Sequence, residues 1–281
     1  MLSDLMHQDP DSLPIAINFE SGVVFGILRG WVNKERIVIL CPATTGTRIG
    51  PQRIYVEIAH ELQKQGIASL CVDLPPLGDS FDNQPEIYQG LPSEKLYLHY
   101  SKFIKIIMNE LFQRYNGFDE IILLSISDGC LPVYRFARAN EIIDRVILLS
   151  PNHLLDEIKK VNSKNFKQYF SKLFKKHTWV KLFLFQLNFS KIFKNIFPKK
   201  GLSFSLPSES IIKNGISIGD VLTIFGENEP SLSQCLSFWG KEKNNIGDYS
   251  TQIVPGADHS FFGWQFKRDV ITYIINWLNI R

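Results

Sequence analysis

Apolar and polar positions follow two different periods along the chain. Short continuous apolar runs, typical of strands buried on both faces, alternate with stretches whose apolar residues recur every three or four positions, as on a helix. The stretch 52–65 carries Ile54, Ile58 and Leu62 on one such helical face and stops at Gly66. The segments IAINFE and VVFGIL, joined at Ser21-Gly22, predict an antiparallel pair of strands. Further strands are expected at RIVILC, IASLCV, the run into Ser127, RVILLS, DVLTIF and STQIV, and further helices at about 92–115, after Gly129, at 231–240 and at 262–280.

This alternation predicts an α/β protein with a mostly parallel central sheet and helices on both faces. The segment from about 151 to 217 interrupts it. Within that segment Phe166, Phe170 and Phe174 are four residues apart, which predicts amphipathic helices with aromatic inner faces. We therefore expect a core made of 1–150 and 218–281, with 151–217 inserted as a helical cap over the carboxyl edge of the sheet, where open α/β folds bind ligands.

Charge separates the predicted cap from the core. The chain has a net charge of +3, yet 158–200 holds twelve lysines and no acidic residue, which leaves nineteen basic against twenty-eight acidic residues elsewhere. Three interpretations of the cap stay open: a solvated helical face, a surface for peripheral contact with anionic membrane, and a lid whose Phe side chains line an acyl pocket while its lysines attract an anionic or carrier-bound substrate. A nucleic-acid partner is not expected.

Composition and cysteine spacing narrow the class of protein. Apolar residues make up 44% and charged residues 21% of the chain, as in ordinary globular proteins. No apolar run reaches the length of a membrane span, and the start, MLSDLMHQDPDSLP, lacks the features of an export signal, so we expect a cytoplasmic protein. The four cysteines are widely spaced and without a CxxC pair, which favours buried free thiols over a zinc site or a disulfide framework.

The run IILLSISDGCLP carries the first candidate for chemistry. Ile121–Leu124 predicts a buried strand, and the residues after Gly129 have helical spacing, so the unit is a strand, a sharp turn and a helix. In the pattern Gly-x-Ser-x-Gly, such a turn presents a nucleophilic serine and needs small flanking residues. Here Ser127 takes the central place, Gly129 is kept, and Ser125 stands where the first glycine is expected. A serine that only caps the turn is the alternative.

Two later strands are followed by the partners that a serine nucleophile needs. FGENEP follows one strand and supplies two carboxylates, Glu227 and Glu229, and GADHSFFGW follows the last strand and supplies His259. The order serine, acid, histidine, with each residue just past an apolar strand, is that of the α/β-hydrolase triad. All three strand ends are expected at the same edge of the sheet.

Together, SISDG, FGENEP, GADHSFF and CVDLPPLGDS resemble motifs of serine hydrolases of the α/β-hydrolase superfamily, over nearly all of the chain except the basic insertion. The resemblance implies Ser127 as nucleophile, His259 as base and Glu229, three residues after the glycine, as acid, with Glu227 as the alternative acid. Glutamate replaces the usual aspartate. The stretch PATTGTRIGPQRIYVEIAHEL is also similar to hydrolases found alongside exosortase and exopolysaccharide systems.

The resemblance also implies an oxyanion hole formed by backbone N–H groups. One donor is Asp128, directly after the nucleophile, and the other lies in the loop after RIVILC. Because Pro42 has no N–H, the second donor is Ala43 or Thr44.

The loop CVDLPPLGDS is expected to lie beneath the site. It is similar to the Asp-x-x-Gly-x-Gly-x-Ser loop of the superfamily, with Asp73, Gly78 and Ser80 kept and prolines at 75 and 76 as departures. Asp73 is expected to hold this loop, and the acid of a variant arrangement is the alternative role. Arg48 and Arg53 have two open interpretations, a structural role and a contact with an anionic group of the substrate.

These residues predict a serine hydrolase that cleaves a carboxylic ester or thioester through an acyl-enzyme intermediate. Such a triad uses no metal ion and no cofactor, and we expect neither. The expected partner is a small-molecule acyl ester or thioester, free or carrier-bound. Two alternatives stay open: an acyltransferase with the same triad, and a catalytically silent binding protein, which Ser125, the glutamate acid and the proline-rich loop all leave possible.

Overall fold

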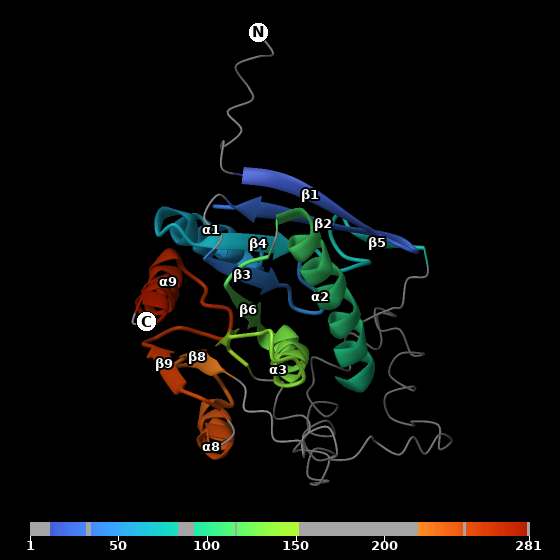
Figure 1. Ribbon diagram of the computed structural model, residues 1–281. Helices are drawn as coiled ribbons and strands as arrows, with labels where there is room; N and C mark the ends of the chain where they lie inside the picture. The colour runs from blue at the N-terminus through green and yellow to red at the C-terminus, as the bar shows by residue number, and fades with distance from the viewer. Residues whose placement is uncertain are drawn as a thin grey trace, which may run out of the picture. The chain divides into compact units, whose positions relative to one another are not determined.

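The computed structural model describes residues 12–31, 35–83, 93–115, 117–151, 219–243 and 246–279. These residues form one mixed sheet of nine strands, in the order β1-β2-β4-β3-β6-β7-β8-β9, with β5 pairing with β2 (Figure 1). The strands are β1 (Ser12–Phe19), β2 (Gly22–Arg29), β3 (Arg36–Cys41), β4 (Ala68–Val72), β5 (Phe81–Asp82), β6 (Glu120–Ile126), β7 (Arg145–Leu149), β8 (Asp220–Gly226) and β9 (Tyr249–Val254). β1 and β2 pair antiparallel, as do β2 and β4, and all neighbours from β4 to β9 pair parallel. The mostly parallel sheet predicted from the sequence is therefore confirmed.

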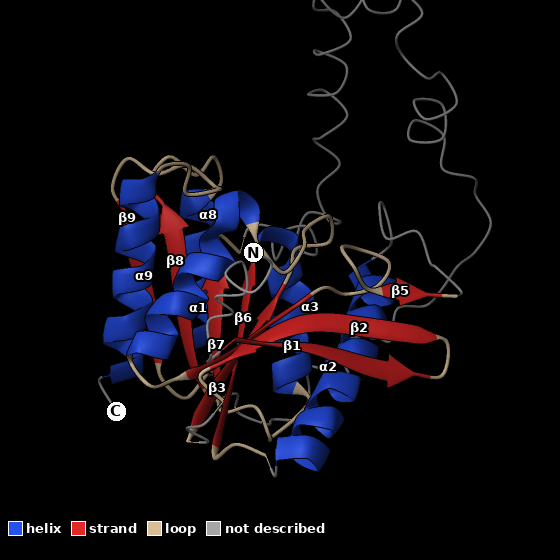
Figure 2. Ribbon diagram, turned by 90° about the horizontal axis from the view of Figure 1, so that it is seen from above, coloured by secondary structure: helices blue, strands red, loops and turns tan. Residues whose placement is uncertain are grey.

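Helices cover both faces of the sheet. They are α1 (Ile54–Lys64), α2 (Ser93–Tyr115), α3 (Cys130–Arg138), α8 (Leu232–Glu242) and α9 (Trp264–Asn279). In Figure 1, α1 and α9 lie on one face, and α2 and α3 lie on the other. Figure 2 shows how strongly the sheet twists between β8 and β1, as open sheets of this size do.

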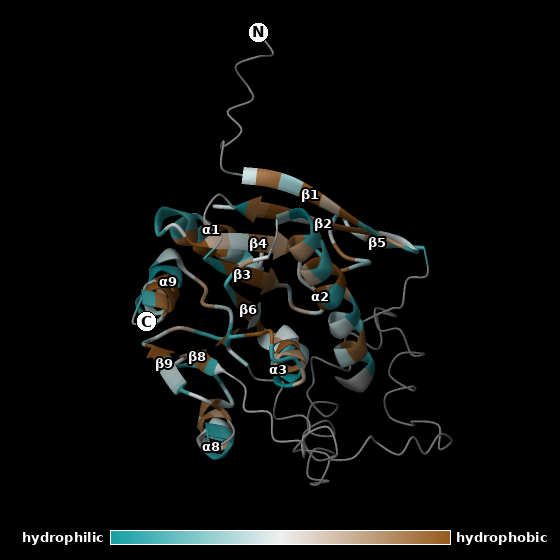
Figure 3. Cartoon of the chain, in the orientation of Figure 1, coloured by the Kyte–Doolittle hydropathy of each residue, from teal (hydrophilic) through white to brown (hydrophobic). Residues whose placement is uncertain are grey.

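Two apolar cores, one on each face, explain the continuous apolar runs in the sequence. Side chains of a strand alternate between its two faces. In β3, Ile37 and Ile39 pack into the core under α2, α3 and α8, whereas Val38 and Leu40 pack into the core under α1 and α9. The edge strand β1 differs, because it buries only alternate residues such as Ile15 and Ile17, and Figure 3 shows the corresponding alternation of hydropathy.

Two differences from the expected elements go beyond shifts of a few residues at their ends. The predicted helix 52–65 is continuous only from Ile54, because Gln52 and Arg53 have φ angles of 50° and 66° and belong to a separate 3-10 turn. Its end matches the expected glycine stop, with Gly66 at φ 72°. The two-residue strand β5 was not predicted, since its sequence, Phe-Asp, is too short to show a period.

The parallel register brings the candidate site residues to one edge. In neighbouring strands Ile126 is opposite Leu149, Leu149 is opposite Ile224, and Gly226 is opposite Val254, so β6, β7, β8 and β9 end within two residues of one another. Residues that follow these strands therefore share the carboxyl edge. The predicted cap, 151–217, lies outside the described residues apart from Pro151, and its division from the core stays a prediction. Among the described helices, none combines the length and apolar character needed to cross a bilayer.

Candidate active site

Ser127 lies at a strained position in the turn between β6 and α3. Its φ angle is 57°, in the left-handed region that residues with a side chain rarely adopt. A short 3-10 turn, Ser127–Gly129, joins the strand directly to the helix. Gly129 is needed there, because a Cβ at that position would come within 2.6 Å of the Pro42 carbonyl oxygen and 2.4 Å of Ser125 Oγ. The turn has the geometry that presents a nucleophile at the edge of a sheet.

Ser125 occupies the place of the missing first glycine without disturbing the turn. Its side chain is fully buried, and its hydroxyl donates a hydrogen bond to the Cys41 carbonyl oxygen at 3.0 Å. The hydroxyl is thus satisfied inside the core, which removes the main cost of a buried polar group. Serine in place of glycine at position 125 therefore adds a hydrogen bond between β6 and the end of β3.

His259 connects Ser127 to Glu229. The distance from His259 Nε2 to Ser127 Oγ is 2.8 Å, and the distance from Nδ1 to Glu229 Oε1 is also 2.8 Å. The Glu229 side chain is fully buried, and that of His259 is 34% exposed. The three residues that follow β6, β8 and β9 thus form one continuous chain of hydrogen bonds, ordered as the sequence predicted.

Backbone contacts between two loops hold the acid and the histidine at this distance. Gly226 ends β8 where a Cβ would lie 2.5 Å or less from the carbonyl oxygens of Ala257 and Asp258. The N–H of Asn228 then donates to the Ala257 carbonyl at 2.9 Å. The glycine therefore lets the loop with Glu229 pass directly against the loop with His259.

Glu227, the alternative acid, makes a different contact. Its Oε2 accepts a hydrogen bond from the N–H of Gly256 at 2.8 Å, on the exposed side of the same two loops. The structure therefore brings Glu229, and not Glu227, to the His259 ring.

The second oxyanion donor is expected in the loop after β3. Of the two residues considered, Thr44 gives its N–H to the Asp128 carboxylate at 2.9 Å, and its hydroxyl also bonds that carboxylate. Ala43 instead lines a cavity together with Ser127 and His259. The geometry therefore favours Ala43 over Thr44. The contact of the Asp128 side chain had no signal in the sequence.

The cavity at Ser127 has a volume of about 380 Å³. Its described lining is made mainly of small or apolar residues, and His259 is its one titratable side chain. The lining residues other than Ser127 and His259 are Ala43, Thr45, Gly46, Thr47, Gly50, Pro51, Ile126 and Ser260. Such a surface suits an uncharged part of a ligand.

Comparison with known proteins finds likeness in structure only. The sequence matches no family model and no curated protein. An esterase from Pyrococcus furiosus superposes with a TM-score of 0.64 at 18% identity, over 99% of this chain and 92% of the esterase. Est1E from Butyrivibrio proteoclasticus, in a structure with ferulic acid bound, gives 0.62 at 15% identity, over 93% and 98% of the two chains. The chain has the α/β-hydrolase fold. A dienelactone hydrolase from Anabaena variabilis agrees, with 0.58 at 12% identity over 95% of each chain.

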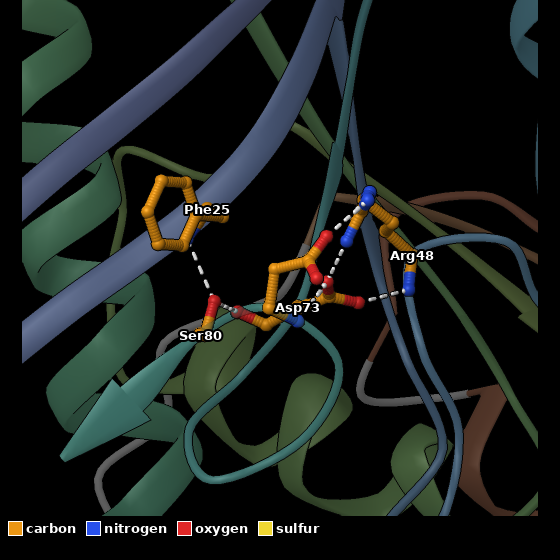
Figure 4. Close-up of polar contacts among 5 residues, drawn as sticks. Phe25, Arg48, Asp73 and Ser80 are labelled. Carbon is orange, nitrogen blue, oxygen red and sulfur yellow. Dashed lines mark hydrogen bonds and ion pairs between the residues drawn. The ribbon is translucent and has the colours of Figure 1, made fainter.

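Within this α/β-hydrolase fold, Asp73 holds together the loop after β4 (Figure 4). Its buried carboxylate accepts hydrogen bonds from the N–H of Arg48 at 2.6 Å and of Asp79 at 3.1 Å, and it pairs with the Arg48 guanidinium. Gly78, at φ 61°, approaches the carboxylate so closely that a Cβ would lie 2.2 Å from it. Ser80 donates to the Asp73 carbonyl at 2.8 Å and accepts from the N–H of Phe25 at 2.7 Å.

This network favours the structural role of Arg48. Its guanidinium pairs with both Asp73 and Asp79, and Arg48 is not among the residues that line the cavity. The ion pairs keep the pKa of Arg48 above its ordinary value, although partial burial alone would lower it. A cation that is already neutralised by two carboxylates has little attraction left for an anionic substrate.

We expect Asp73→Asn to lower the free energy of unfolding by about 3 kcal/mol, because it leaves the Arg48 charge without its buried partner. Asp79→Asn is the matched control. It removes the second carboxylate of Arg48, but the Asp79 side chain is 66% exposed, so the expected loss is under about 1 kcal/mol. Urea unfolding of both variants measures the two values. Equal losses would contradict the central place given to Asp73.

The cysteine thiols have low reactivity. All four are free and buried, as the sequence predicts. Burial raises the pKa values of Cys41 and Cys71 to about 12. Cys130 lies directly after the turn, and burial raises its pKa well above the ordinary value while its thiol bonds the carbonyls of Ser125 and Leu149, each at 3.4 Å. The Cys130 thiol therefore stays protonated and is a poor nucleophile.

Proposed function

We propose that this protein is a serine hydrolase that cleaves a carboxylic ester or thioester through an acyl-enzyme intermediate. One observation carries the proposal. The hydroxyl of Ser127, held in a strained turn beside a cavity, is bonded to His259, which is bonded in turn to the buried Glu229. A capping serine needs neither the strain nor the two partners, whereas an activated nucleophile needs both.

The proposed reaction begins with attack by Ser127 Oγ on the acyl carbonyl carbon while His259 Nε2 takes the hydroxyl proton. For Nε2 to accept, Nδ1 must carry the ring hydrogen, and Glu229 Oε1 is the acceptor that holds this tautomer. The carboxylate then stabilises the imidazolium. The carbonyl oxygen becomes negative and receives hydrogen bonds from the N–H groups of Asp128 and Ala43.

Collapse of this intermediate breaks the bond to the alcohol or thiol, which leaves with the proton from His259. A water molecule then gives a proton to His259 and attacks the acyl group on Ser127, and a second collapse releases the carboxylic acid and restores the serine. An acceptor alcohol in the place of water would make the same site an acyltransferase.

The substrate is proposed from the lining of the cavity and from the charge of the predicted cap. The small, largely uncharged surface near Ser127 suits the acyl part. The twelve lysines of 158–200 would attract a substrate with an anionic leaving part or an acidic carrier, or would hold the protein at an anionic membrane. The likeness of 42–62 to hydrolases found alongside exosortase systems stays a prediction. So does a cytoplasmic location.

A fluorophosphonate probe tests the proposal, because it reacts with an activated serine and not with an ordinary hydroxyl. We expect the folded protein to be labelled once, on the peptide that contains Ser127, and we expect protein unfolded in urea to stay unlabelled. Peptide mass spectrometry identifies the site. A panel of p-nitrophenyl esters and acyl thioesters of graded length then defines the substrate. Folded protein that resists the probe would support the silent binding protein instead.

A further inference from the structure

Side chains from three different elements fix the peptides of the loop after β3. The Cys41 carbonyl accepts hydrogen bonds from Tyr55 Oη at 2.8 Å and from Ser125 Oγ at 3.0 Å. The next carbonyl, that of Pro42, accepts from Tyr100 Oη at 2.6 Å. Both tyrosines are almost completely buried, Tyr55 in α1 and Tyr100 in α2. This loop is therefore held from the core and not only by its own backbone.

The hydrogen bond from Tyr100 to the Pro42 carbonyl sets the direction of the Ala43 N–H group. The peptide between Pro42 and Ala43 is trans, so its carbonyl and its N–H point in opposite directions. Tyr100 holds the carbonyl on the side of the α2 core. The N–H of Ala43 is then directed away from that core, and Ala43 lines the cavity at Ser127.

The following peptide is held by Asp128. The N–H of Thr44 donates to Asp128 Oδ1 at 2.9 Å, and the Thr44 hydroxyl bonds Oδ2. Asp128, whose backbone N–H is one proposed oxyanion donor, thus also binds through its side chain the loop that carries the other proposed donor, Ala43. The two proposed donors are thereby joined into one unit.

Tyr100 stays a hydrogen-bond donor at neutral pH. Burial, with an added contribution from the nearby Asp128 carboxylate, raises the pKa of its phenol well above the ordinary value. The hydroxyl therefore keeps the proton that it gives to the Pro42 carbonyl.

We propose that Tyr100 and Asp128 are positioning residues of the oxyanion hole, and that they hold the peptides on either side of Ala43 so that its N–H points to the substrate carbonyl oxygen. This inference rests on the proposed serine hydrolase function. Neither side chain touches the substrate, and each acts through the backbone of the loop after β3.

Tyr100→Phe tests the role of Tyr100, with Tyr55→Phe as a matched control. Each change removes one buried hydroxyl and its hydrogen bond to one of two successive carbonyls, that of Cys41 at the end of β3 for Tyr55 and that of Pro42 for Tyr100. The difference lies in the peptide that is released. Pro42 has no N–H, so the peptide that Tyr55 holds has no donor to orient, whereas the peptide that Tyr100 holds carries the N–H of Ala43.

We expect Tyr100→Phe to lower kcat on p-nitrophenyl butyrate about 10- to 100-fold, somewhat less than the loss of a whole oxyanion donor. KM should change by less than about threefold, because the oxyanion forms only after binding. An alkyl trifluoromethyl ketone, which adds Ser127 Oγ at its carbonyl carbon and leaves a negative oxygen, should bind more weakly by about the same factor as kcat/KM falls. Tyr55→Phe should change all three values by less than about threefold.

The possible outcomes separate this inference from the proposed function. Equal effects of Tyr100→Phe and Tyr55→Phe, or a rise in KM without a fall in kcat, would overturn the inference while leaving the hydrolase intact. Wild-type protein without activity or labelling would overturn the proposed function itself. If Tyr100→Phe shows no cooperative thermal transition, it is not folded, and the kinetics of Asp128→Ala then test the inference. This variant keeps the backbone N–H of Asp128 and should show the same split between kcat and KM, and unchanged kinetics would overturn the inference.

Discussion

Ser127→Ala is expected to lower kcat for ester hydrolysis by about 10⁴- to 10⁶-fold, because it removes the atom that forms the acyl enzyme. His259 and the oxyanion donors stay in place, so a small residual rate above that in water should persist from binding and electrostatic stabilisation alone. Steady-state kinetics on the best ester of the panel, with the variant purified separately from the wild type to prevent contamination, measures the loss. A loss below about tenfold would rule out Ser127 as the nucleophile.

Ser127→Gly is the informative companion of this variant. It removes the hydroxyl as well, but glycine adopts a φ angle of 57° without strain. We expect activity as low as that of Ser127→Ala, together with a free energy of unfolding about 1 kcal/mol higher than that of Ser127→Ala. Urea unfolding compares the two. Equal stability would mean that the turn imposes no strain at Ser127.

Much of this fold follows from the period of the apolar residues. Ile121–Leu124 had to be a strand covered on both faces, because every one of its side chains is apolar and successive side chains point to opposite faces. The same rule placed β3, β7 and β8. Once these strands are parallel, their carboxyl ends share an edge, so the residues that follow them could be expected at one site.

The residues that support the site were beyond such reasoning. Tyr100 looks like any apolar position on the inner face of a long helix, and nothing in its neighbourhood indicates that its hydroxyl meets Pro42, 58 residues away. Asp128 was assigned a backbone role only, since its side chain finds Thr44 through the three-dimensional path of the loop after β3. A single contact between two distant segments produces no periodic pattern of residues, so the sequence alone does not predict it.

The role of Arg48 could not be predicted from the sequence either. An arginine in a loop near a predicted site is equally consistent with a substrate contact and with a structural ion pair. The structure separates the two because it brings Asp73 and Asp79, from a different loop, to the same guanidinium. The assignment thus depended on tertiary contacts and not on the residue type.

The choice between the two carboxylates of FGENEP can be tested directly. We expect Glu229→Gln to lower kcat by about 10³- to 10⁴-fold, because the neutral amide neither stabilises the imidazolium nor holds the productive tautomer of His259. Glu227→Gln should lower it by less than about threefold, since an amide oxygen can still accept from the N–H of Gly256. Kinetics of both variants on one ester, with circular dichroism as a check on folding, provide the comparison.

The two glutamates lie two residues apart, in one loop, with the same side chain, so a general effect of losing a charge there would appear in both variants. What differs is burial and partner: Glu229 is buried against Nδ1 of His259, and Glu227 bonds Gly256 on the exposed side. A large loss confined to Glu229→Gln therefore reports the bond to the imidazole. A large loss confined to Glu227→Gln would reverse the assignment, and would require the loop after β8 to rearrange when substrate binds.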